Sequence, residues 1–542
     1  MLFAILLFLL QGAPASIEGV VVRAGTSTPV ARARVSIGAA QALTDASGRF
    51  SFKNLRPGSY RVSAAHNAYL PAQYGERTRG AQGKEITLGS GQDVKDIVVS
   101  LTPKSAISGR LYDKYGDPVT NANVQALKYT YQDGRRILIV VDTARTNDLG
   151  EYRLFWLTPG PYIISAIPPE SLFAVEGGVI GISAGPVRFD GNVVAPAPSP
   201  ETHLAVYYPG TTDPAGASLI DLPPGINYTG VDLPVIDARA VGVRGQIVNS
   251  LTGQPAIGAA INLVPRRGTV ATGSTARAVV GAGGVFEFRH MAPGSYDLVA
   301  SAPGTGGGAR LAAHAPVELG GSDVDGVSLV LQPQLTINGR ITLENSQPDE
   351  TGTSVRGARV ELRREPFTPE LLILLPGVAA DGTFTLSGVT PGEYRLKVSL
   401  GGFKSYVKTA RFGGIDALNP PFRIDVADGR LEIVVGRNPG SLDGAVLDDA
   451  LKPFPDATVV LVPEPPRRQR FDLYYAAGSD ASGRVHFDGL APGDYKIFAW
   501  DDVPADAWQD PDFLRTYENL GKPVRVSEGS QESIDLKLIP RS

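Results

Sequence analysis

Residues 44–60 read TDASGRFSFKNLRPGSY, and this stretch decides the fold. Phe50 and Phe52 alternate with polar residues, and a period of two predicts a strand with one buried face. Pro57-Gly58 then predicts a tight turn, because proline fixes φ and glycine accepts a positive φ. Alternation resumes at Tyr60, so the stretch predicts a strand, a turn and a second strand.

The same pattern occurs five times along the chain. In each copy a glycine precedes a Pro-Gly-x-Tyr motif by nine positions, and the tyrosine lies three positions after the proline. The copies are Gly48, Pro57 and Tyr60; Gly150, Pro159 and Tyr162; Gly284, Pro293 and Tyr296; Gly382, Pro391 and Tyr394; and Gly483, Pro492 and Tyr495. Repetition at a fixed offset predicts tandem copies of one structural unit.

Two further alternating elements precede each copy. One is an apolar-x-Gly-x-apolar step around Gly19, Gly109, Gly245, Gly339 and Gly444. The other is a small-x-branched step at Ala33/Val35, Ala122/Val124, Ala259/Ile261, Ala358/Val360 and Ala457/Val459. About seven short strands, separated by turn signals, fall in roughly 85 to 135 residues per copy, which predicts an antiparallel β-sandwich.

The sequence therefore predicts an all-β chain of five tandem sandwiches in an elongated array. The expected boundaries are 16–103, 104–238, 239–333, 334–437 and 438–542, called segments one to five below. Residues 170–201, rich in Gly, Pro and Ala, are expected to form a long insertion loop in segment two.

Composition restricts the chemistry available to the chain. The absence of cysteine excludes disulfides, thiolate metal sites, cysteine nucleophiles and a lipid anchor on cysteine. A net charge of -4 over 542 residues gives no electrostatic reason to expect nucleic acid or a membrane surface as partner.

The N-terminus has the pattern of an export signal. Residues 1–10 are apolar but too few to span a hydrocarbon core of ~30 Å. Ala13-Pro14-Ala15 has the small-x-small form of a cleavage site, so residues 1–15 are expected to be a signal peptide cleaved before Ser16. No Lys or Arg precedes the apolar run, and a buried N-terminal strand or helix is the alternative. We expect a secreted chain (periplasm, outer surface or extracellular) whose mature form does not insert into a membrane.

Segment one resembles a known family. The residues that carry the resemblance are Gly19–Val21, Ala33–Val35, Thr44–Phe50 and Leu55–Tyr60, and all five segments are similar to the same domain, the carboxypeptidase regulatory-like domain. The resemblance implies a transthyretin-like, carbohydrate-binding-like sandwich. Tyr207–Thr212 and Gln73–Gly75 resemble loops of large, multi-domain, secreted bacterial proteins of this family. The resemblance implies no single activity, since the domain is an accessory module.

Motifs for catalysis are incomplete. A zinc carboxypeptidase needs His-x-x-Glu, and none of the five histidines has Glu at the third following position. Residues 181–185 match the Gly-x-Ser-x-Gly elbow, but no helix is expected behind them. Turns such as Asp45–Gly48 lack the alternating acidic ligands and closing Glu of a calcium loop. We expect no enzyme, no cofactor and no metal.

Exposed aromatic rings are the remaining route to a ligand, because a sugar's C–H face stacks on a π face. The candidate sugar-binding residues are Trp500, Trp508, Tyr474 and Tyr475 in segment five, with Tyr129, Tyr131, Tyr207 and Tyr208 as a weaker set in segment two. Trp156 lies in an alternating strand and is expected to be core or half-buried.

Two functions remain open from the sequence. The first is a non-catalytic structural, adhesive or protein-interaction scaffold of the cell envelope or secretome. The second is a carbohydrate-binding protein that uses the aromatic residues of segment five or two. The partner, protein or polysaccharide, and the oligomeric state are not specified by the sequence.

Overall fold

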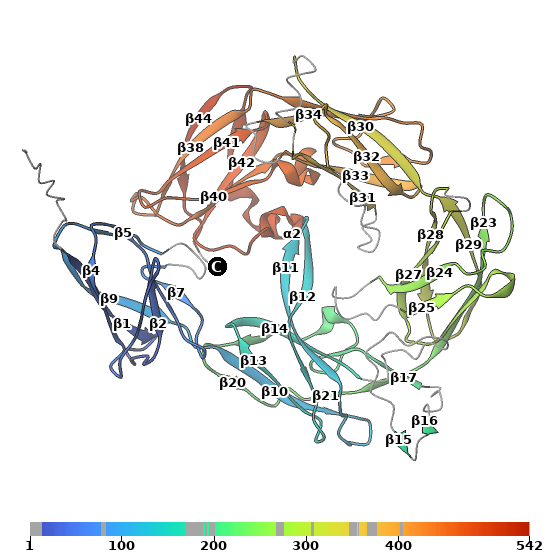
Figure 1. Ribbon diagram of the computed structural model, residues 1–542, viewed down its shortest axis with the longest axis horizontal. Coiled ribbons are helices and arrows are strands. Elements are labelled where there is room, and N and C mark those ends of the chain that lie inside the picture. The colour runs from blue at the N-terminus through green and yellow to red at the C-terminus, as the bar shows by residue number, and fades with distance from the viewer. Residues whose placement is uncertain are drawn as a thin grey trace, which may run out of the picture. The chain divides into compact units, whose positions relative to one another are not determined.

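The computed structural model describes residues 14–76, 83–168, 188–189, 192–193, 201–266, 276–304, 308–345, 355, 357–365, 377–400 and 405–540. The chain divides into two compact units. Unit one comprises Met1–Leu127, Val141–Ala166 and Tyr207–Pro234; unit two comprises Lys128–Val140, Ile167–Val206 and Val235–Ser542. Both are built almost entirely of β-strands (Figure 1), which confirms the all-β class.

Segment one, in unit one, is a sandwich of short strands. One sheet has the order β4 (Arg49–Leu55), β1 (Ala15–Arg23), β9 (Asp93–Leu101). A second has the order β3 (Ala40–Leu43), β2 (Arg34–Ile37), β6 (Val62–Ala65), β7 (Ala72–Gln73), and β5 (Gly58–Tyr60) pairs with β8 (Ile86–Leu88). Phe50, Phe52 and Val62 are buried between the sheets, as the alternation predicts.

Segment two repeats this plan. Around β10 (Ser105–Tyr112) lie β13 (Glu151–Leu157), β20 (Asn227–Tyr228) and β21 (Leu233–Pro234). The second sheet contains β12 (Arg135–Arg145), β11 (Asn123–Gln132), β14 (Gly160–Ile167), β18 (Val206–Tyr207) and β19 (Ile220–Leu222). Most of the predicted insertion loop, and the elbow motif at 181–185, lie outside the described residues; β15 (Arg188–Phe189) and β16 (Asn192–Val193) form a small hairpin there.

Unit two contains the strands of segments three to five. Segment three forms one seven-stranded sheet in the order β25 (Ala276–Val279), β24 (Ala260–Pro265), β27 (Gly294–Ala302), β28 (Leu311–Leu319), β29 (Val324–Pro333), β23 (Val241–Asn249), β26 (Val285–Met291). Nearby in sequence, β17 (Glu201–Leu204) pairs with β22 (Ile236–Arg239).

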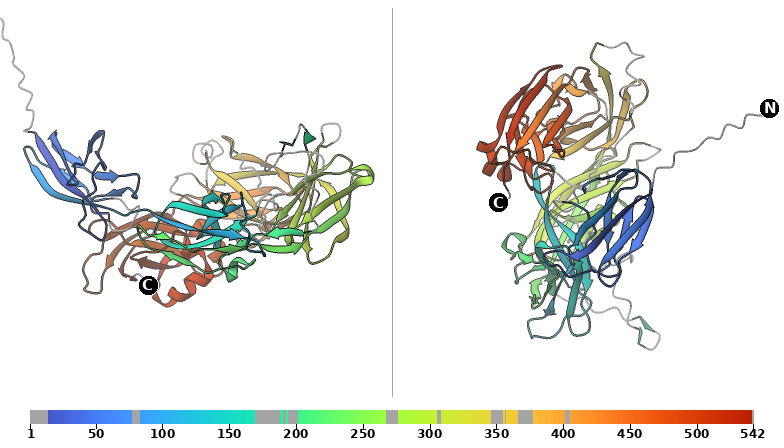
Figure 2. Two further views of the ribbon diagram at one scale, coloured as in Figure 1. Left: turned by 90° about the horizontal axis from the view of Figure 1, so that it is seen from below. Right: turned by 90° about the vertical axis from the view of Figure 1, so that its left-hand side faces the viewer.

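Segments four and five again form paired sheets. Segment four has β32 (Thr383–Val389), β30 (Leu335–Leu343), β37 (Leu431–Gly436), β34 (Tyr406–Phe412), β35 (Ile415–Asp416), opposite β31 (Arg359–Glu365), β33 (Gly392–Ser399), β36 (Phe422–Ile424). Segment five has β41 (Arg484–Leu490), β38 (Gly440–Leu447), β44 (Gln531–Lys537), opposite β40 (Tyr475–Gly478), β39 (Thr458–Pro463), β42 (Gly493–Trp500), β43 (Lys522–Val526). A helix, α2 (Pro511–Tyr517), lies between β42 and β43 in sequence and is drawn as a coiled ribbon in the red part of the chain in Figure 2. The five-domain boundaries and the elongated array stay predictions.

The sandwiches each contain parallel pairing beside their antiparallel pairing. The first strand of each segment pairs in parallel with a late strand: β1 with β9, β10 with β20 and β21, β23 with β29, β30 with β37, and β38 with β44. Parallel neighbours need a long crossover connection, and the intervening strands of the segment provide it. Alternation within a strand does not reveal the direction of the neighbouring strand.

The turn glycines have a steric role in all five segments. Gly48, Gly150, Gly284, Gly382 and Gly483 have φ between 71° and 81°. At Gly48 a Cβ atom would lie 2.6 Å from the carbonyl oxygen of Val21 in the first strand, and at Gly150 it would lie 2.5 Å from that of Leu111. All five positions therefore disfavour a side chain by conformation, and Gly48 and Gly150 exclude one by contact as well.

Each Pro-Gly-x-Tyr motif is closed by its tyrosine. The hydroxyl donates a hydrogen bond to the carbonyl oxygen four residues earlier, directly before the proline. The pairs are Tyr60–Arg56 at 2.8 Å, Tyr162–Thr158 at 2.7 Å, Tyr296–Ala292 at 2.9 Å, Tyr394–Thr390 at 2.6 Å and Tyr495–Ala491 at 2.7 Å. Burial raises the pKa of Tyr296 to about 12, so its hydroxyl stays a donor at neutral pH. The motif is a tyrosine corner.

At the N-terminus, residues 1–13 of the predicted signal peptide lie outside the described residues. Ala15 is the first residue of β1 and is buried, so cleavage before Ser16 would remove the first residue of that strand. Among the described residues, no helix is long and apolar enough to cross a bilayer.

Replacing a corner tyrosine by phenylalanine should destabilise its segment. In Tyr495→Phe the ring is kept, but the buried Ala491 carbonyl loses its donor, and we expect a loss of about 1–2 kcal/mol in unfolding free energy. Denaturant unfolding followed by tryptophan fluorescence measures it, since segment five holds Trp500 and Trp508. Tyr517→Phe is the control, because no hydrogen bond of the Tyr517 hydroxyl is found among the described residues. Equal losses in the two variants would contradict a structural role for the corner.

Candidate interaction sites

The four aromatic residues predicted to bind sugar do not form an exposed platform. Trp500 is 1% exposed and Trp508 is 7% exposed. Tyr474 and Tyr475 are half-buried, and the Tyr474 hydroxyl donates to the Arg468 carbonyl oxygen at 2.8 Å. The exposure that sugar stacking requires is therefore not found at these residues, and the prediction of a sugar platform there is corrected.

Their role is to form a second, smaller core in segment five. Trp500 stacks on Phe498 with ring centroids 5.0 Å apart, and Tyr517 of α2 meets Trp500 edge-on at 5.7 Å. Beneath α2 this core contains Val460, Val462, Phe498, Trp500, Trp508, Leu514 and Ile539. Strand β39 is thus apolar on both faces, one facing the sandwich interior and the other facing α2.

The weaker set in segment two does not converge either. Tyr207 is 4% exposed. The Tyr131 ring packs edge-on against Phe513 of α2 at 5.9 Å, and the guanidinium of Arg136 lies 3.6 Å from the Tyr129 ring centroid. These contacts already use the rings of Tyr129 and Tyr131.

A cluster of charged side chains connects the turn that follows α2 to the rest of segment five. Glu518 accepts two hydrogen bonds from Arg468, at 2.9 and 2.7 Å, and one from Lys496 at 2.5 Å. The hydrogen bond from Arg468, followed by that from Lys496, lowers the pKa of Glu518 to about 2 against the desolvation that would raise it.

This cluster gives segment five a defined acid sensitivity. A carboxyl whose pKa falls from 4.5 to about 2 on folding adds stability above pH 4.5, and loses it as the pH falls toward 2. We expect the melting temperature of Glu518→Gln to be lower at pH 7 and to depend less on pH between 5 and 2 than that of the unmodified protein. Glu432→Gln, at an exposed position of β37, is the control and should keep the full pH dependence. An unchanged pH profile in Glu518→Gln would contradict this assignment.

The tip of the β11–β12 hairpin belongs to unit two. Asp133 and Gly134, with φ of 48° and 69°, form the two-residue turn expected of an Asp-Gly sequence. At Gly134 a Cβ atom would lie 2.9 Å from the Gln509 carbonyl oxygen and 2.9 Å from the Phe471 ring, so the tip packs closely on segment five.

The Asp133 carboxylate fixes the same tip to segment four. It forms an ion pair with Arg363 of β31 and lies 3.8 Å from the Lys397 Nζ of β33. Burial alone would lower the pKa of Arg363, but Asp133 and Glu361 outweigh it and raise this pKa above its ordinary value. The hairpin tip therefore contacts the strands of two segments.

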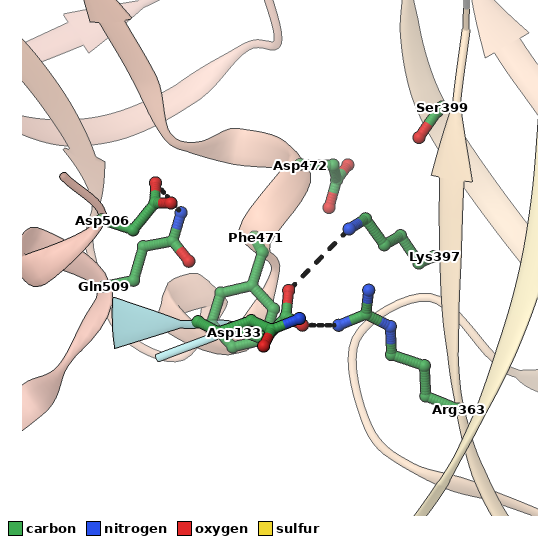
Figure 3. A pocket seen from close by; sticks show the side chains of 9 residues that line it. Asp133, Arg363, Lys397, Ser399, Phe471, Asp472, Asp506 and Gln509 are labelled. Carbon is green, nitrogen blue, oxygen red and sulfur yellow. Dashed lines mark hydrogen bonds and ion pairs between the residues drawn. The ribbon is translucent and has the colours of Figure 1, made fainter. Parts of the chain in front are cut away.

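A polar cavity of about 340 Å³ lies at this junction. Figure 3 shows its lining, with dashed contacts from Asp133 to Arg363 and Lys397. The lining residues are Gln132, Asp133, Arg363, Lys397, Ser399, Phe471, Asp472, Asp506 and Gln509. They come from three stretches of sequence that are far apart: the hairpin tip, β31 and β33, and the turns around Phe471 and Trp508.

Substitution at the tip should release it. Gly134→Ala introduces both a strained φ and a close contact, and we expect faster amide hydrogen exchange across Lys128–Val140 with the sandwiches intact. Gly116→Ala is the matched control, since Gly116 also has a positive φ of 87° but nothing within 4 Å of its Cβ position. Similar exchange in 128–140 for both variants would show that the contact with segment five does not hold the tip.

The exposed aromatic side chains of unit one lie elsewhere. Trp156 is 62% exposed and its neighbour Phe155 is 51% exposed, with ring centroids 5.2 Å apart. The Lys104 ammonium lies 5.0 Å from the Trp156 ring centroid. The expectation that Trp156 is core or half-buried is therefore wrong, because a register shift in β13 opposite Ser105–Ile107 breaks the alternation.

This register shift is present in every segment, six positions after the turn glycine. A residue with φ between 57° and 81° occupies it each time: Asn54, Trp156, His290, Gly388 and Gly489. Gly, Asn and His tolerate this conformation, whereas a bulky side chain adopts it only under strain. Trp156 is thus the one residue of the five that opposes its backbone geometry.

The histidines do not assemble a catalytic or metal site in the described part of the chain. His203 lies 2.7 Å from Asp237, His314 lies 3.3 Å from Asp297 and His486 lies 2.9 Å from Asp443. Each pair is on a different pair of strands, and the described residues contain no group of three or more acidic or histidine ligands placed for a metal ion.

Comparison with known proteins agrees with the fold. Residues 16–102 and 242–331 match the family model of the carboxypeptidase regulatory-like domain, which confirms the resemblance for these two regions. No curated protein matches the chain.

Three solved structures show the level of structural similarity. The Bacillus anthracis TIE protein is 9% identical, with 78% of this chain and 68% of that chain covered and a TM-score of 0.15. The major pilin subunit of Bacillus cereus is 10% identical, with coverages of 59% and 99% and a TM-score of 0.15. The minor pilin of Streptococcus agalactiae is 12% identical, with coverages of 37% and 97% and a TM-score of 0.20. At these values the similarities carry no argument about function.

Proposed function

We propose that this protein is a non-catalytic, exported scaffold that binds a protein partner through Phe155 and Trp156. The observation that supports it is the exposed, left-handed Trp156, at a position where the other segments have Asn, His or Gly. Incomplete catalytic motifs and an accessory-domain family match support the non-catalytic part of the proposal.

The left-handed conformation of Trp156 costs folding free energy. A left-handed residue with a Cβ costs roughly 1–2 kcal/mol relative to glycine, and a large exposed ring recovers little of this by burial. Residues in strained backbone conformations cluster at functional sites. Trp is also one of the three side chains, with Tyr and Arg, that are enriched among residues that dominate binding energy at protein interfaces.

A stability measurement and a contact measurement test the proposal together. Trp156→Asn and Trp156→Gly copy the residues of other segments, so we expect unfolding free energies equal to or above those of the unmodified protein, by up to about 1 kcal/mol. A photo-crosslinking amino acid at position 156, in the exported protein on its own cells, should give a discrete protein adduct.

The control places the same crosslinker at Tyr115, which is 79% exposed and also in segment two. It should give no adduct of the same mass. Destabilisation by Trp156→Gly would show that the ring is structural, and equal adducts at both positions would contradict a specific interface at Phe155 and Trp156.

A further inference from the structure

The cavity beneath the hairpin tip has the size of a small-ligand site. Its volume, about 340 Å³, lies at the lower end of the range of roughly 300–1,000 Å³ found for ligand pockets. Such a space accepts a molecule of one or two sugar rings but not a folded partner. It is independent of Phe155 and Trp156, which belong to unit one.

The lining is mainly polar and combines hydrogen-bond donors with acceptors. Lys397 donates, the carboxylates of Asp472 and Asp506 accept, and the amides of Gln132 and Gln509 do both. The Ser399 hydroxyl adds one more group of both kinds, whereas Phe471 is the one aromatic residue of the lining.

This lining disfavours other classes of ligand. An apolar molecule would displace water from the charged and amide groups of the lining without replacing their hydration, which is unfavourable. An inorganic anion would meet three carboxylates, those of Asp133, Asp472 and Asp506, against the two cations Arg363 and Lys397. A metal ion is disfavoured because the described acidic residues do not cluster as ligands.

We propose that this cavity binds a neutral polyhydroxylated ligand, a monosaccharide or disaccharide. Each sugar hydroxyl both donates and accepts, so it matches a lining of mixed donors and acceptors. Phe471 is half-buried and packs against Gly134, so hydrogen bonds, and not stacking on an aromatic ring, would hold the ligand. The ammonium of Lys397 and the carboxylate of Asp472, which both line the cavity (Figure 3), would bind sugar hydroxyls.

The polar groups are held in place by contacts within the protein. Asp472 accepts from Arg470 at 2.6 and 3.2 Å, and the Gln509 amide donates to Asp506 at 3.3 Å. The Arg470 side chain is itself nearly buried, at 8% exposed. Side chains fixed in this way lose little freedom when a ligand binds, which favours binding of a small polar molecule.

Saturation-transfer NMR and calorimetry on the full chain test the proposal. The probes are glucose, galactose, N-acetylglucosamine, maltose and lactose, with inorganic phosphate and glycerol as comparison ligands. We expect saturable binding of at least one sugar with Kd on the order of 1 mM, as is reasonable for so few ligand atoms.

Two variants then locate the binding. Ser399→Tyr fills the cavity from the exposed end of β33 and should abolish binding, while Lys397→Met removes one charged donor and should weaken it roughly tenfold. Lys537→Met is the control. The Lys537 Nζ lies 3.0 Å from Asp449, in a different part of segment five, so this variant should bind sugar as the unmodified protein does.

Three results would overturn the proposal: no sugar binding up to saturating concentrations, sugar binding that Ser399→Tyr leaves unchanged, or phosphate binding in preference to every sugar. Circular dichroism of each variant separates loss of binding from loss of fold. Failure of sugar binding would leave the crosslinking result at Trp156 unaffected, so the two proposals are tested separately.

Discussion

The hydrogen bond from each corner tyrosine to the carbonyl before its Pro-Gly turn is the constraint on which the rest of each segment depends. It fixes the turn at the point where the chain passes from one sheet to the other, for example from β41 to β42 in segment five. The turn glycine, at the start of the strand before the corner, lies against the first strand of its segment. In four segments a Cβ atom at this glycine would lie 2.9 Å or less from a carbonyl oxygen of that first strand. Because the chain has no cysteine, each segment must be stabilised by these backbone contacts and by burial of apolar side chains.

Most of the strand pattern was predictable because it depends on local alternation. Phe50 and Phe52, like Phe286 and Phe288, are buried where a period of two places them. The parallel pairing of first and last strands was not predictable, since β1 and β9 are about eighty positions apart and strand direction leaves no mark on alternation. The tyrosine corner had a visible signal in the sequence. A Tyr that recurs where Phe would fill the same space indicates that its hydroxyl forms a hydrogen bond.

The sites were harder to predict, for two physical reasons. Trp500 lies on the outer face of β42, and alternation alone predicts that such a face meets water; here α2 covers it. The unbroken apolar run 459–462 within β39 was the available signal, because a strand buried on both faces loses its alternation. The burial of Trp156 was predicted wrongly because one extra residue in β13 shifts every later side chain to the other face. The cavity could not be predicted because it joins residues as distant in sequence as Asp133 and Gln509.

The parallel pairing of the first and last strands has a mechanical consequence. When a segment is pulled by its two ends, β1 and β9, or β38 and β44, are drawn along their length in opposite directions. The force then acts along the strands, in shear, so the hydrogen bonds between the two strands must break together and not one after another. Under tension, each segment would therefore resist extension through the strand pair at which it begins and ends.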